Sequence, residues 1–264
     1  MIETHGLSVR LGPRAVLQDI AFHARPGALT AIVGPNGSGK TTLLRALSGD
    51  LPFTGSVRLN GLPLGTTPVW ELARHRAVLA QHTPVGFPFT VLEVVRLGLS
   101  ASARPELTAE EALARVGLAG HAGRLFPELS GGEQQRCHLA RVLAQLGHPT
   151  GPSGPRWLFL DEPVSALDIG HQLMVMGLAR RFADSGGGVV AVMHDLNLTA
   201  QFAGSVALLA DGRLIRQGSP EEVLADEPLS AAYQCRLRLN RAPVQGRWFL
   251  PQMAGGHEPA GLTS

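Results

Sequence analysis

Cysteine, tyrosine and paired histidines are scarce in this chain of 264 residues. Its two cysteines, Cys137 and Cys235, form no CxxC pair, which favours reduced thiols over a disulfide framework or a zinc site. The ten histidines include no HxH or HxxxH pair, so we expect no structural metal. A single tyrosine and a net charge of +2 offer neither the stacking surface nor the charge that nucleic-acid binding requires, and we expect no nucleic acid as a partner.

Long apolar runs are also missing. No segment approaches the ~20 apolar residues that are needed to cross a bilayer. The first residues, MIETHGLSVR, lack the basic start and apolar run of a signal peptide. We therefore expect a soluble chain that reaches a membrane only through a partner. A content of 44% hydrophobic and 17% charged residues is that of a globular protein with a full core.

Alternating strand and helix signals predict an α/β fold, with a phosphate-binding core built on a mixed sheet and an inserted α-helical subdomain. We assign the core to residues 1–81 and 151–240 and the helical subdomain to residues 82–150. Residues 241–264, rich in glycine and proline, are predicted to be a loosely ordered tail. The whole chain is then one domain with an insertion.

Short local patterns mark where several elements begin and end. We expect a helix that ends at Gly49, a capping box formed by Thr108 and Glu111, a helix capped by Ser219 with Glu222 three residues later, and a hairpin turn at Asp211-Gly212. The segment GHPTGPSGPR, at 147–156, is dense in glycine and proline and is predicted to be a loop.

Residues 34–42 read GPNGSGKTT and follow an apolar run at 28–33. They match the pattern G-x-x-x-x-G-K-[ST], in which glycines let successive backbone N–H groups face phosphate oxygens and the following helix adds its positive end. Lys40 would contact the β- and γ-phosphates of a nucleotide, and the Thr41 hydroxyl would bind Mg²⁺. The predicted contacts are Gly34, Pro35, Asn36, Gly37, Ser38, Gly39, Lys40, Thr41 and Thr42. A chance glycine turn is the alternative.

The segment LFLDEP supplies the acidic half of such a site. A buried strand at 157–160 would place Asp161 and Glu162 at its carboxyl end, where open parallel sheets bind ligands. Asp161 would hold Mg²⁺, and Glu162 would act as general base toward an attacking water. An acidic turn that only caps a helix is the alternative.

We expect Gln81 to end an apolar strand at 76–81 and His194 to end the apolar strand VVAVM. Gln81 could reach Mg²⁺ or the attacking water, and His194 could contact the γ-phosphate. Taken alone, each is equally compatible with a polar side chain that simply ends a strand.

LSGGEQQR, at 129–136, is a second phosphate-binding pattern at the start of a helix. Together with GPNGSGKTT, Gln81, LFLDEP, SALD (165–168) and His194, in this order, it makes the chain resemble the ATP-binding subunit of an ABC transporter up to about residue 240. We call LSGGEQQR the signature. The resemblance implies that two copies pair head to tail, so that the signature of each copy closes over the ATP of the other copy. The implied contacts are Ser130, Gly131, Gly132, Glu133 and, at the seam between the copies, Asp168.

Further resemblances narrow the group. HDLNLTAQFA (194–203) is similar to importers of iron chelates, cobalamin and haem, and QHTPVGFPFTVLEVVRLG (81–98) is similar to haemin importers. They imply a haem importer's ATPase at the cytoplasmic face of the bacterial inner membrane, peripheral to a permease dimer. A periplasmic haem-binding protein would take part indirectly, and haem would not bind this chain. The apolar residues Val85, Phe87, Pro88 and Phe89 are expected to be exposed and would suit docking of the permease. The alternative is that the two phenylalanines pack inward under the helical insert.

Other interpretations stay open. The same ATPase could serve ferric-siderophore or cobalamin import, because the ATP site never meets the cargo. A non-transport ABC protein of DNA repair or translation, or a P-loop kinase or GTPase, fits less of the pattern. Leu11 occupies the place where many members of the family stack an aromatic ring on adenine, so the adenine contacts are left open.

Overall fold

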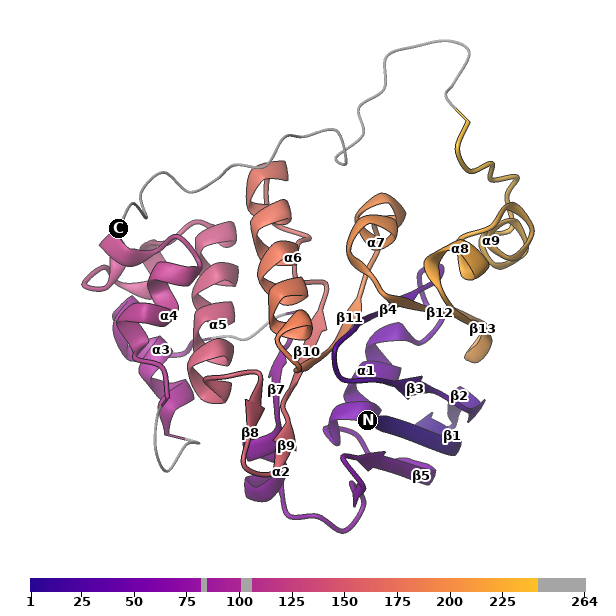
Figure 1. Cartoon of the computed structure of the whole chain (residues 1–264), viewed down its shortest axis with the longest axis horizontal. Coiled ribbons are helices and arrows are strands. Elements are labelled where there is room, and N and C mark those ends of the chain that lie inside the picture. The colour runs from indigo at the N-terminus through magenta and orange to yellow at the C-terminus, as the bar shows by residue number, and fades with distance from the viewer. Residues whose placement is uncertain (82–84, 101–105, 242–264) are drawn as a thin grey trace.

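A computed structural model describes residues 1–81, 85–100 and 106–241 (Figure 1). Its centre is a six-stranded sheet in the order β13-β12-β4-β11-β10-β7. All neighbours in it are parallel except β12 and β13, which confirms the predicted mixed sheet. The strands are β4 (Leu29–Val33), β7 (Arg76–Leu79), β10 (Trp157–Asp161), β11 (Gly188–Val192), β12 (Ser205–Ala210) and β13 (Arg213–Gly218).

A second, antiparallel sheet in the order β2-β1-β5-β6, with β3 paired to β1, lies on the other side of α1 (Lys40–Ser48) (Figure 1). Its strands are β1 (Ile2–Leu11), β2 (Arg14–Ile20), β3 (His23–Ala24), β5 (Thr54–Leu59) and β6 (Leu62–Pro63).

The parallel strands are buried on both faces, as continuous apolar runs require. Along β10, Trp157 and Phe159 point into the core around α1, whereas Leu158 and Leu160 point into the core on the opposite face. This alternation follows from the two-residue period of a strand. The central sheet is therefore packed on both faces, and this packing fixes the position of the loops at its carboxyl edge.

Three helices cover the segment predicted to be the helical subdomain, at the magenta left of Figure 1: α3 (Val91–Leu99), α4 (Ala109–Arg115) and α5 (Gly131–Leu146). Two 3₁₀ turns, Ala119–His121 and Phe126–Glu128, lead into α5. Val95 of α3 and Leu143 of α5 belong to the same apolar cluster as Leu158 of β10, so these helices share a core with the sheet.

The remaining helices are α2 (Val69–His75), α6 (Ile169–Asp184), α7 (Leu196–Phe202), α8 (Pro220–Val223) and α9 (Asp226–Tyr233). The predicted capping boxes at Thr108 and Ser219 are confirmed, and Gly49 ends α1. Asp211 and Gly212 both have positive φ, 48° and 71°, and form the predicted two-residue turn between β12 and β13.

The prediction of a plain loop at 147–156 is wrong. A short hairpin of β8 (Thr150–Gly151) and β9 (Gly154–Pro155) lies within it. Arg156 holds the hairpin in place, because its guanidinium donates to the carbonyl oxygens of Leu146 and His148 and pairs with Glu106 at 2.5 Å. A composition rich in glycine and proline does not reveal such a long-range partner.

Within the described ranges, no helix has both the length and the apolar character that a membrane crossing requires. The predicted loose tail falls almost wholly on residues 242–264, which lie outside the described residues.

Candidate functional site

The glycine-rich loop at 34–39 joins β4 to α1, as its motif requires. Gly34, Gly37 and Gly39 have φ of 149°, 78° and 102°, values that side chains rarely adopt. A Cβ added at Gly34 would lie 2.0 Å from the Leu209 carbonyl oxygen. The loop therefore keeps this shape only with glycine there, and it opens directly onto the N-terminus of α1.

Lys40 is 5% exposed and reaches back over this loop. Its Nζ donates to the carbonyl oxygens of Gly34 at 2.9 Å and Pro35 at 3.0 Å. Burial lowers the pKa of Lys40, while the nearby carboxylates of Glu162 and Asp161 raise it. The ammonium group is thus held at the centre of the loop, where a phosphate chain would need a positive charge.

Thr41 and Asp161 lie together at the end of this cradle. The Thr41 hydroxyl donates to Asp161 Oδ1 at 3.0 Å, and Asp161 is 4% exposed. Burial raises the pKa of Asp161, which the Thr41 hydrogen bond opposes and the charge of Glu162 reinforces. A buried carboxylate beside a hydroxyl is a donor set that fits Mg²⁺, which takes one or two protein oxygens and completes its shell with phosphate and water. No group of three or more acidic, histidine or cysteine side chains that could hold a metal occurs in the described residues.

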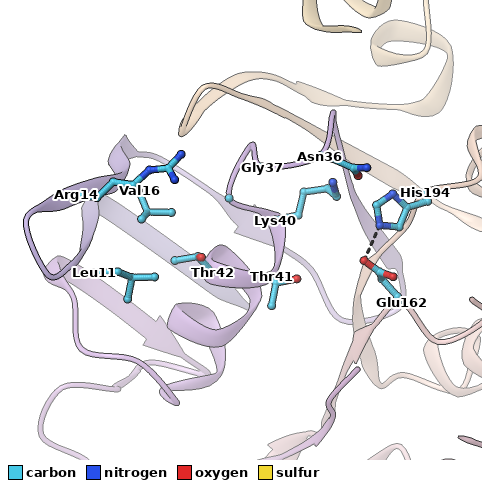
Figure 2. Close-up of a pocket in the computed structure, with 11 residues that line it drawn as sticks. Leu11, Arg14, Val16, Asn36, Gly37, Lys40, Thr41, Thr42, Glu162 and His194 are labelled. Carbon is cyan, nitrogen blue, oxygen red and sulfur yellow. Dashed lines mark hydrogen bonds and ion pairs between the residues drawn. The ribbon is translucent and has the colours of Figure 1, made fainter. Parts of the chain in front are cut away.

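Glu162 follows β10, and its carboxylate is held from two sides. Gln81 Nε2 donates to Oε2 at 2.9 Å. On the other side, His194 Nε2 lies 2.5 Å from Oε1 (Figure 2). The expected ends of two strands need correction, because β7 ends at Leu79 and β11 at Val192, two residues before each of these side chains. Gln81 and His194 thus lie in the loops just beyond these strands, from which both side chains contact Glu162.

A cleft of about 600 Å³ runs over the loop. Glu162 and His194 line one end, and Leu11, Arg14 and Val16 line the other (Figure 2). Leu11 is 47% exposed there. Sequence motifs did not predict Arg14 and Val16 as site residues, because LGPRAVL matches no ligand-binding motif. Of the predicted loop residues, Asn36, Gly37, Gly39, Lys40, Thr41 and Thr42 line the cleft. Ser38 is buried instead, and its Oγ has no hydrogen-bond partner among the described residues.

The signature residues lie apart from this cleft. Ser130 caps α5 with a reciprocal capping box, in which its hydroxyl accepts from the Glu133 N–H at 3.3 Å and donates to Glu133 Oε2 at 2.8 Å. Ser130 and Gly131 are exposed. Among the described residues that line the cleft, none comes from 129–136. The glycine-rich loop and the segment at 129–136 therefore lie at separate places on the chain, and the phosphate contacts predicted for Ser130, Gly131 and Gly132 stay predictions.

Glu133 carries a stable negative charge. Hydrogen bonds from Ser130 lower its pKa from 4.5 to about 2, and His121 and Arg124 approach it at 3.2 and 3.6 Å. Asp168, also predicted to contact nucleotide, caps α6 by accepting from the His171 N–H at 2.9 Å. Both carboxylates thus have a local structural role, and their predicted nucleotide contacts stay predictions.

The four apolar residues predicted to dock the permease differ in their exposure to solvent. Phe87 is 71% exposed and Pro88 is exposed, whereas Val85 and Phe89 are half-buried and pack against the core. The expectation that all four are exposed is therefore wrong. The ring of Phe87 meets that of Phe89 edge-on at 6.0 Å.

Fold and site together define a P-loop nucleotide-binding cassette, with a phosphate cradle, a buried metal-type carboxylate and a general-base candidate. The family model described as ABC transporter matches residues 17–165. The chain belongs to the ABC transporter family and is one of its ATP-hydrolysing cassettes.

Known proteins agree with this assignment. The chain is 57% identical over 258 residues to the hemin import ATP-binding protein HmuV of Jannaschia sp. (strain CCS1), covering 96% of this chain and 95% of that protein. A bacterial ABC transporter cassette solved as a dimer is 28% identical, with a TM-score of 0.72 over 83% of this chain and 99% of that one. An inward-facing ABC transporter described as metal-chelate type is 26% identical, with a TM-score of 0.71 and 89% of each chain covered.

Proposed function

We propose that this chain hydrolyses ATP to power the import of haem through a membrane permease. The observation that carries the proposal is Glu162, held by Gln81 and His194 at the end of a nucleotide cleft. The similarity to a hemin import ATP-binding protein over nearly the full length supports the cargo.

The proposed chemistry is transfer of the γ-phosphoryl group to water. The loop N–H groups and Lys40 bind the phosphates, and Glu162 accepts a proton from the water as its oxygen attacks phosphorus. The bond to the bridging oxygen breaks, which leaves ADP and phosphate. His194 orients the Glu162 carboxylate, and Gln81 holds its second oxygen. Thr41 and Asp161 would bind Mg²⁺, which would neutralise phosphate charge.

The second phosphate-binding feature suggests a head-to-tail homodimer. Ser130, Gly131 and Gly132 are outside the cleft of their own chain, and the positive end of α5 can cap a phosphate brought by a second copy. A related cassette was solved as a dimer. ATP would then hold two copies together, and hydrolysis would release them.

The opening and closing of this dimer would move a permease at the cytoplasmic face of the membrane. Phe87 and Pro88 offer an apolar contact for it. Haem itself would pass through the permease from a periplasmic binding protein without touching this chain.

Ferric-siderophore and cobalamin import remain the second candidate, favoured by the similarity to a metal-chelate type transporter. Vesicles that contain the whole complex should take up labelled haem when ATP is inside, and a complex with Glu162→Gln should not. Uptake of a siderophore or cobalamin in preference to haem would reject the cargo while leaving the ATPase intact.

The dimer has its own test. Glu162→Gln should keep ATP binding, lose turnover by about 10²–10⁴-fold and elute as a dimer with ATP in size-exclusion chromatography. Lys40→Ala should stay monomeric under the same conditions. A Glu162→Gln protein that binds ATP and remains monomeric would reject the paired arrangement.

A further inference from the structure

The backbone carbonyl of Glu162 receives a hydrogen bond from another helix. Gln135 Nε2, on α5, donates to it at 3.0 Å. The other donors to this oxygen in the described structure are the N–H and hydroxyl of Ser165, at 3.4 and 3.2 Å, from the same loop. Gln135 is therefore the link that ties the backbone of the general base to the helix that starts at Ser130.

Glu162 needs such a link because its own conformation is unfavourable. Its φ is 50°, in the left-handed region that residues with a Cβ adopt only when their surroundings hold them there. A peptide plane in this region sets the direction of the side chain, and here it sends the carboxylate to Gln81 and His194. A bond that fixes the plane consequently helps to aim the base.

The Gln135 amide is not placed for its own best hydrogen bonding. A carbonyl oxygen can only accept, so the amide nitrogen must face Glu162. This leaves Oε1 of Gln135 buried without a partner among the described residues, which costs free energy. An amide that leaves its own oxygen without a partner favours a role in positioning the Glu162 backbone over a role in satisfying the hydrogen bonds of Gln135 itself.

The first turn of α5 also contacts the segment that follows Glu162. A Cβ added at Gly132 would lie 3.2 Å from the Ala166 carbonyl oxygen and from Leu167 Cδ2. From the other side, Gln172 of α6 donates to the carbonyl oxygens of Val164 and Leu167 at 3.3 and 3.1 Å. The segment that follows Glu162 therefore lies between α5 and α6 and is contacted by both.

We propose that Gln135 is a positioning residue for Glu162, and that through it the engagement of Ser130 with a second chain's nucleotide is transmitted to this chain's own base. The transmission step rests on the proposed homodimer. The contact needed for it is short: Gln135 lies five positions after Ser130 on one rigid helix, and its side chain touches the base's peptide directly. Each base would then be aimed best when both nucleotides are in place.

The test compares Gln135→Leu with Gln145→Leu in the full-length protein. Gln145 is a matched control, because it lies on the same helix, is equally half-buried and donates to two backbone carbonyls, of Ala73 and Arg76, far from Glu162. We expect Gln135→Leu to lower kcat about tenfold or more while changing ATP affinity less than about twofold. Its Hill coefficient for ATP should fall toward one, and Gln145→Leu should keep both values.

Gln135→Glu serves where the leucine variant does not fold. A carboxylate cannot donate to a carbonyl, but its protonated form can. The activity of Gln135→Glu relative to the parent should therefore rise as the pH falls, which a merely structural residue would not produce.

The inference fails if Gln135→Leu retains the parental kcat, or if Gln145→Leu loses as much. It also fails if the Hill coefficient of Gln135→Leu stays parental. These results differ from a failure of the proposed function, which would show as absence of the ATP-dependent dimer in Glu162→Gln with Gln135 intact.

Discussion

The Nε2 atom of His194 lies 2.5 Å from Oε1 of Glu162, and the two residues follow neighbouring parallel strands, β11 and β10. The histidine thus contacts the proposed base as well as lining the cleft. We expect His194→Ala to lower kcat about 10²-fold with little change in ATP affinity, because the base loses its orientation but the phosphate cradle stays intact. Phosphate release and an ATP titration measure the two quantities.

His148→Ala is the control for that substitution, since His148 is exposed and the hydrogen bonds at its N–H and its carbonyl oxygen both use its backbone. Equal losses in both variants would contradict a specific role of His194.

Lys40 is the only lysine of the chain, so amine chemistry reports on one side chain besides the N-terminus. Burial lowers its pKa, and its Nζ donates to the carbonyl oxygens of Gly34 and Pro35. We expect an amine-reactive label to modify Lys40 in the free protein and ATP to protect it, as read by peptide mass spectrometry. Lys40→Ala should weaken ATP binding by about 10–100-fold, because a buried charge on the phosphates is lost. Modification of Lys40 that is unaffected by saturating ATP would contradict its position in the site.

Asp161→Asn should separate stability from activity. Burial raises the folded-state pKa of Asp161, so the folded protein favours the neutral acid. The stability that the neutral acid contributes is therefore lost as the pH rises through the folded pKa. At neutral pH the charged carboxylate therefore destabilises the nucleotide-free protein. We expect Asp161→Asn to raise the melting temperature at pH 7 while lowering Mg²⁺-dependent turnover by about 10²-fold. A lower melting temperature with unchanged turnover would contradict both statements.

The pair of Glu106 and Arg156 should give the fold an acid-sensitive contact. Hydrogen bonds from Arg156 lower the pKa of Glu106 from 4.5 to about 2. Because the folded pKa is depressed, the stabilisation is complete above about pH 4.5 and is lost as the pH falls toward 2. Glu106 is one-third exposed, so we expect Glu106→Gln to cost only about 1 kcal/mol at pH 7 and little near pH 2.

Urea unfolding at pH 7 and pH 3 measures this difference. Glu110→Gln is the control, because its pair with Arg96 has both side chains 57% exposed and should contribute little at either pH. A loss for Glu106→Gln that does not shrink at low pH would show that the charge is not its cause.

Local signals in the sequence predicted the parts of this molecule that depend on neighbours in the chain. The phosphate loop, the capping box at Thr108 and the turn at Asp211-Gly212 each need only a few adjacent residues of the right type. The strand at β10 was readable for the same reason, because four apolar residues precede an acidic pair.

The contacts that join distant segments could not be predicted in this way. Gln135 belongs to a motif that was recognised, yet its bond to a carbonyl 27 positions away depends on how α5 crosses β10. The hairpin of β8 and β9 and the wall formed by Leu11, Arg14 and Val16 likewise depend on tertiary packing. Their residue types are ordinary, and only the fold gives them partners.

The capping box at Ser130 also bears on which anions this protein ignores. The positive end of α5 is already matched by an internal anion, Glu133, which stays ionised throughout the physiological range. A free phosphate ion would be repelled by the Glu133 carboxylate, and it would bring no positive group of its own to offset that repulsion. We therefore expect the exposed end of the helix to bind dissolved phosphate weakly, and the proposed nucleotide of a second copy to bind there only together with groups of that copy's surface.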